Sequence, residues 1–148
     1  MAETTGRRLS QYLFRVATWD YHYGLRAVDP KRRVDSGCYS EIALLTFPGS
    51  LLRPENSKYR TAFVTLSGKA GMMEEPEGGK LEAIGSFQAR GDEINAYIFV
   101  PFERLSQLNV VAQSGAVQVL NVIGTKLRYG SGLIRSLSVD TQFDEEDW

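Results

Sequence analysis

The 148-residue sequence has little of the material from which disulfides, metal centres and membrane spans are built. It contains one cysteine, Cys38, and one histidine, His22, so an internal disulfide and a cysteine-based zinc site are both excluded. No stretch approaches the roughly 18 consecutive apolar residues that a membrane-spanning helix needs. The charged start, residues 1–8, has no apolar core after it. We therefore expect no secretory signal, no membrane partner and a cytoplasmic location.

The residues that are present fit one ordinary folded domain. Apolar residues make up 43% of the chain and charged residues 24%, which argues against a disordered polypeptide. No repeat of fixed period divides the chain. We predict a flexible basic N-terminus over residues 1–8, a single β-rich domain over residues 9–141 and an acidic C-terminal tail over residues 142–148.

Apolar periodicity predicts a mainly β fold. Alternation every two residues is typical of a strand with one buried face, and over residues 59–67 it places Ala62, Val64 and Leu66 on one side. A second strand is expected to begin at Tyr39 and to end at a Pro48-Gly49 turn. With about seven or eight such strands, the sheet has to close into an antiparallel barrel or fold into a two-layer sandwich.

One α-helix is expected near residues 101–113. Pro101 suits a first helical position because it has no N–H group to leave unpaired. Phe102, Leu105 and Leu108 follow at helical spacing, and Gly115 can supply the left-handed stop.

The net charge of −1 hides an uneven distribution. From Met1 to Arg33 there are seven basic and three acidic residues, whereas from Asp140 to Trp148 there are five acidic residues and no basic one. Such ends could attract each other, or the basic end could bind a polyanion. Solvated termini without a specific partner are the simpler interpretation.

The segment Trp19-Asp20-Tyr21-His22-Tyr23 is the most unusual local feature. In a continuous strand from Tyr12, the aromatic residues Trp19, Tyr21 and Tyr23 lie on the face opposite to that of Tyr12. They share this face with Leu25, which favours packing in the core. Alternatively, these rings stack on nucleic-acid bases while nearby cations bind phosphates. The candidate interaction surface comprises Trp19, Tyr21, His22, Tyr23, Arg26, Lys31, Arg32, Arg33 and Trp148.

Residues suited to catalysis or metal binding are few. His22, oriented by Asp20, could act as a base for Cys38, but no signature of a known nucleophile flanks this cysteine. A lone cysteine is more often a small apolar residue or an inert thiol. The acidic residues Glu74, Glu75 and Glu77 lie in a loop without the Asp/Asn-Gly alternation of a calcium loop. We therefore expect no catalytic residues, no metal and no cofactor.

The ending Phe143-Asp144-Glu145-Glu146-Asp147-Trp148 resembles the acidic, aromatic-tipped tails of single-stranded DNA-binding proteins. In that family, the tail docks partner proteins and competes with DNA for a basic groove. The resemblance covers six residues: the family's long glycine- or proline-rich linker is missing, and the late helix does not match its five-strand barrel. An acidic tail that keeps the protein in solution is the alternative.

Three functional hypotheses follow. The leading one is a non-catalytic binding or assembly module that acts through protein–protein contacts, with exposed strand edges that favour a homo-oligomer. The alternative is a single-stranded nucleic-acid-binding protein whose basic, aromatic N-terminal third binds in a salt-dependent manner. The third is a Cys38–His22 enzyme, which requires a reactive thiolate at neutral pH.

Overall fold

The computed structural model describes residues 8–27, 39–73 and 83–144. This part of the chain forms eight strands and one helix, which confirms the mainly β prediction with a helix near residues 101–113. The elements are β1 (Leu9–Val16), β2 (Asp20–Ala27), β3 (Tyr39–Arg53), β4 (Thr61–Lys69), β5 (Gly85–Arg90), β6 (Glu93–Pro101), α1 (Phe102–Gln113), β7 (Val119–Thr125) and β8 (Ser131–Asp140).

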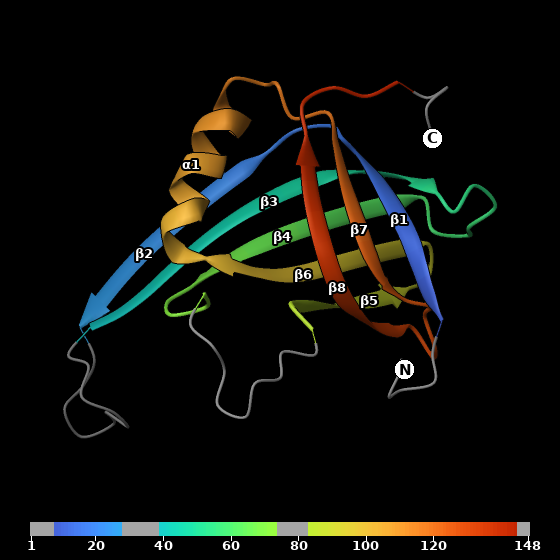
Figure 1. Cartoon of the computed structure of the whole chain (residues 1–148), viewed down its shortest axis with the longest axis horizontal. Helices are drawn as coiled ribbons and strands as arrows, with labels where there is room; N and C mark the ends of the chain where they lie inside the picture. The colour runs from blue at the N-terminus through green and yellow to red at the C-terminus, as the bar shows by residue number, and fades with distance from the viewer. Residues whose placement is uncertain (1–7, 28–38, 74–82, 145–148) are drawn as a thin grey trace.

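Seven of the strands close into a barrel, which decides between the barrel and the sandwich (Figure 1). Their order is β1-β7-β8-β5-β6-β4-β3, and β3 pairs back with β1. The neighbours are antiparallel except for β4 and β6, which are parallel. Closure removes the free edges of a sheet and lets all inward side chains share one core.

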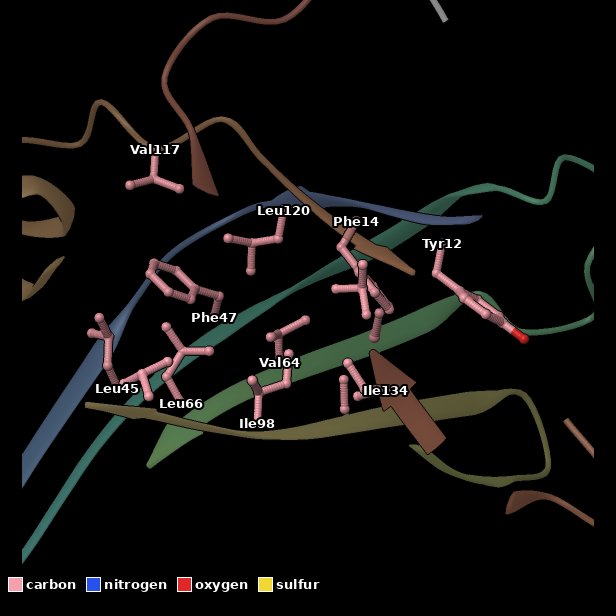
Figure 2. Packing of buried hydrophobic residues seen from close by; sticks show 14 of the residues in the cluster. Tyr12, Phe14, Leu45, Phe47, Val64, Leu66, Ile98, Val117, Leu120 and Ile134 are labelled. Atoms are coloured by element: carbon pink, nitrogen blue, oxygen red, sulfur yellow. The ribbon is translucent and has the colours of Figure 1, made fainter. Parts of the chain in front are cut away.

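The barrel interior is filled by apolar residues that alternate along the strands (Figure 2). Every barrel strand contributes at least one side chain that is almost or fully buried: Phe14, Leu45, Leu66, Phe87, Ile98, Leu120 and Ile134. This is the pattern expected where the inward positions of a small barrel are occupied by side chains. The face predicted for Ala62, Val64 and Leu66 is confirmed as part of this core.

Helix α1 covers the end of the barrel at which β6 finishes (Figure 1). Pro101 stands at its N-cap position, one residue before the first helical position predicted for it. Gly115 follows the last turn with a φ of 73°, as predicted. Leu105 is buried in the core, whereas Val110 on the outer side is 67% exposed. The helix therefore shields the core from solvent at this end of the barrel.

Strand β3 continues through Pro48 and Gly49, so the turn predicted there is wrong. The Pro48 carbonyl accepts a hydrogen bond from the Ala17 N–H at 2.9 Å. A Cβ atom at Gly49 would lie 1.8 Å from the Arg15 carbonyl oxygen, so only glycine allows this close approach. The two residues therefore allow β1 and β3 to pair closely, and they do not reverse the chain.

The continuous strand expected from Tyr12 to Tyr23 is divided at residues 17–19. β1 pairs with the second part of β3 and β2 with its first part, along the same side of β3. The break shifts the alternation by one residue. Tyr21 consequently lies opposite the buried Leu45 and packs against the same core as Tyr12, on the face opposite to the one predicted.

Candidate protein interaction site

Strands β2 and β3 extend beyond the barrel as a two-stranded arm, at the left of Figure 1. β4 pairs with β3 from Leu44 onward, so residues 39–43 of β3 pair with β2 and not with β4. We refer to residues 23–27 and 39–43 as the ribbon. In the described part of the chain, β2 pairs with no strand other than β3, which leaves one backbone edge of β2 open to an added strand.

The ribbon exposes large apolar side chains to solvent. Leu25 is 62% exposed and Tyr39 is 69% exposed, while Tyr23 and Ile42 are each 46% exposed. Tyr23, Leu25 and Tyr39 lie on the face that is continuous with the barrel interior, because Tyr23 pairs with the buried Ala43. The ribbon thus exposes an apolar face that continues the face of the core, and an exposed apolar face is typical of an interaction surface.

A hydrogen bond links the two strands of the ribbon on this face. The Tyr23 hydroxyl donates to the Glu41 carboxylate. This bond to Glu41 raises the pKa of Tyr23 above its usual 10.0, because it favours the protonated hydroxyl beside the carboxylate. The interaction also places a negative charge among the exposed aromatic rings, which disfavours a phosphate backbone at the same position.

The opposite face of β2 carries Asp20, His22, Gly24 and Arg26, in accordance with strand alternation. The His22 ring lies against Gly24, where a Cβ atom would come within 3.3 Å of its Nε2 atom. The same Cβ atom would lie 3.2 Å from Ile42 Cγ2, so a larger residue would crowd both neighbours. The imidazole is therefore packed along the strand.

The structure brings the described members of the predicted interaction surface together on β2 and at its start. Trp19, in the break before β2, is 36% exposed, and His22, Tyr23 and Arg26 are exposed on the arm. Tyr21 is half-buried against the core, so the core interpretation holds for this aromatic residue alone. The remaining predicted residues, Lys31, Arg32, Arg33 and Trp148, lie outside the described residues, as does Cys38.

Sequence reasoning missed Leu25, Tyr39 and Ile42 as candidate surface residues. Their alternation with polar residues is the same as that of a buried strand, so periodicity cannot tell whether the apolar face is covered. The one available sequence signal is the polar, basic composition of residues 28–38, which separate Leu25 from Tyr39.

A second apolar surface lies between α1 and β8. It is a groove of about 500 Å³, lined among others by Leu108 and Val111 of the helix and by Leu137 and Val139 of the strand. Arg104 stands at the same groove. Nothing in the structure shows what covers this groove.

Neither a cluster of metal ligands nor a membrane-spanning helix occurs in the described residues. Across residues 8–27, 39–73 and 83–144, no three His, Cys, Asp or Glu side chains gather as metal ligands. The same residues include no helix with the length and apolar character to cross a bilayer.

Comparison with protein-family models, with curated proteins and with solved structures gives no match to this chain. Function is therefore inferred from the residues of the chain itself.

Proposed function

We propose that the protein is a non-catalytic binding or assembly module that acts in the cytoplasm through protein–protein contacts made by the ribbon. The observation that carries the proposal is the exposure of Tyr23, Leu25 and Tyr39 beside an open backbone edge. Removing apolar area from water is favourable by roughly 25 cal/mol per Å² before the entropic costs of association are subtracted. An extended segment of a partner can add to β2 through main-chain hydrogen bonds, with specificity from alternate side chains.

Single-stranded nucleic acid remains the alternative partner. Arg26 and the exposed rings of the ribbon support it, since bases stack on aromatic side chains and cations bind phosphates. Glu41, which is hydrogen-bonded to Tyr23 on the face with the exposed rings, opposes nucleic-acid binding there. The negative charge on that face therefore favours a protein partner.

Site-specific photo-crosslinking tests this function. A photoreactive amino acid replaces Leu25 in the full chain, in the cells that normally make the protein, and replaces the equally exposed Val110 of α1 as the matched control. We expect discrete protein adducts from position 25 and none of these from position 110, as resolved by gel electrophoresis and mass spectrometry.

Two other outcomes have definite meanings. Adducts with nucleic acid from position 25 would select the alternative partner. Identical adduct patterns from positions 25 and 110 would show that the ribbon is not the binding surface.

A further inference from the structure

On the basis of the proposed function of the ribbon, we propose that its partner is a second copy of this chain. In the resulting dimer, β2 pairs with β2 of the partner subunit in an antiparallel register centred on Tyr23. The open edge of β2 provides the backbone groups for such pairing. Contact of one surface with itself around a twofold axis is the commonest arrangement of homodimers.

The charges of β2 are complementary to themselves in this register. An antiparallel pair centred on Tyr23 places Asp20 opposite the partner's Arg26, and the twofold axis repeats the contact as Arg26 opposite the partner's Asp20. Both residues are exposed on one face of the strand. Opposite charges directly across an antiparallel pair are stabilising, and like charges are destabilising.

The apolar face of β2 is complementary in the same register. Tyr21 lies opposite the partner's Leu25, and the two copies of Tyr23 lie opposite each other at the centre. Pairs of aromatic side chains, such as the two copies of Tyr23, are among the favourable cross-strand contacts. The exposed surfaces of Tyr23 and Leu25 would thereby leave water.

Gly24 has a place in the same arrangement. It lies opposite the partner's His22, and its lack of a side chain leaves room beside an imidazole. Within one chain, the His22 ring already lies 3.3 Å from the position of a Cβ atom at Gly24. A bulkier residue at Gly24 would therefore meet two histidines in the dimer.

Neighbouring registers lose the charge pairing. Twofold symmetry requires that the centre fall on a single residue, so that equivalent faces remain aligned. A centre on His22 opposes the two histidines, and a centre on Gly24 places His22 opposite the partner's Arg26. The centre on Tyr23 is the one of these three that pairs Asp20 with Arg26.

The edge of β2 lacks several of the features that protect edge strands against pairing. Such edges are commonly protected by charged side chains, above all lysine, by proline or by a very short strand. β2 has eight residues and contains neither lysine nor proline, and its charged residues Asp20 and Arg26 are the two that pair with each other in the proposed register. An edge of this kind suits a strand that pairs with another chain.

A charge exchange tests both the dimer and its register. The variants Asp20→Arg and Arg26→Asp are made in the full chain, and mass is measured by light scattering over a wide range of protein concentration. Each variant alone places like charges opposite each other twice, so we expect its dissociation constant to rise about tenfold or more. An equimolar mixture of the two variants should restore the dimer, because each chain then meets the opposite charges.

The double variant Asp20→Arg, Arg26→Asp should also dimerise like the unaltered chain, since the pairs are exchanged and not lost. Arg104→Asp on α1 is the matched control for a change of surface charge and should leave the mass unchanged. Circular dichroism establishes that each exposed substitution preserves the fold. A monomeric unaltered chain, single variants that dimerise normally, or a mixture that stays monomeric would overturn the proposal.

The outcome is separable from that of the proposed function. Adducts with a different protein from position 25, together with a monomeric chain, would retain the ribbon as a binding surface and reject the homodimer. Absence of protein adducts from position 25, together with a monomeric chain, would reject both. Adducts between two copies of the chain, lost in each single variant and regained in the mixture, would support both.

Discussion

Tyr12 combines a buried ring with a hydroxyl that makes polar contacts. Its ring centroid lies 4.4 Å from that of Phe87 in the barrel core, and its hydroxyl donates to the Thr125 carbonyl at 3.1 Å. Burial raises the pKa of the Tyr12 hydroxyl above 10.0, because the phenolate would lose its hydration in the core. The neutral side chain is therefore the form that suits the folded protein.

We expect Tyr12→Phe to lower the free energy of unfolding at neutral pH by about 1 kcal/mol, because the Thr125 carbonyl loses a donor. The two proteins should also differ in alkali. Since the folded pKa of Tyr12 is raised, its proton leaves the unfolded chain first; the stability due to that shift is complete below 10.0 and is lost as the pH rises through the folded pKa. Urea titrations at neutral and alkaline pH measure both effects.

The comparison between the two proteins isolates Tyr12 from the other tyrosines, including Tyr23, whose pKa is also raised. The unaltered protein should lose stability more steeply in alkali than Tyr12→Phe. Equal slopes would contradict the role given to burial.

At the scale of elements, the pairing of β1 with β3 depends on the close approach of the Arg15 and Gly49 backbones. The position of a Cβ atom there is 1.8 Å from the Arg15 carbonyl oxygen, and this neighbour is backbone in a paired strand. We expect Gly49→Ala to lower the free energy of unfolding by about 2–4 kcal/mol, since the two strands have to separate. Urea denaturation followed by circular dichroism measures the loss.

Gly91→Ala is the matched control. Gly91 lies between β5 and β6 with a φ of 64°, and a Cβ atom there would meet nothing within 4 Å. Its substitution should cost about 1 kcal/mol for the left-handed backbone alone. A Gly49→Ala protein as stable as Gly91→Ala would show that β1 and β3 can move apart at this position without loss of stability.

Elements with local signals were predictable, and those with long-range causes were not. Pro101 and Gly115 mark the ends of α1, because the helix start and stop depend on the dihedral angles of single residues. Pro48 and Gly49 carry an equally strong local signal for a turn, yet β3 continues through them. The close approach of β1, which is distant in sequence, decides the conformation there.

At the scale of the whole molecule, the closed barrel and the projecting ribbon should differ in local stability. β4 is paired on both sides, by β3 and β6, whereas residues 39–43 pair with β2 and not with β4. Amide hydrogen exchange should therefore be slowest in β4 and much faster in the ribbon. Similar protection across barrel and ribbon at low protein concentration would contradict this division.

The candidate site was predictable in composition and not in form. Trp19, His22, Tyr23 and Arg26 were identified from their unusual local sequence, and the described structure places them on β2 and at its start. Tyr21 was expected on the strand face opposite to that of Tyr12. It packs against the same core as Tyr12, because the break at residues 17–19 shifts the alternation of side chains by one residue. That shift arises from two separate pairings along β3, which no local pattern records.

By itself, the sequence determined the mainly β class, the single helix and the buried face of residues 62–66, because two- and three-to-four-residue periods follow from backbone geometry. The tertiary structure decided the closure of β1 on β3, and it decided that the apolar side chains Tyr23, Leu25 and Tyr39 are exposed. Both depend on which strands meet in space. A strand presents the same alternation whether its apolar face meets a core, solvent or another chain.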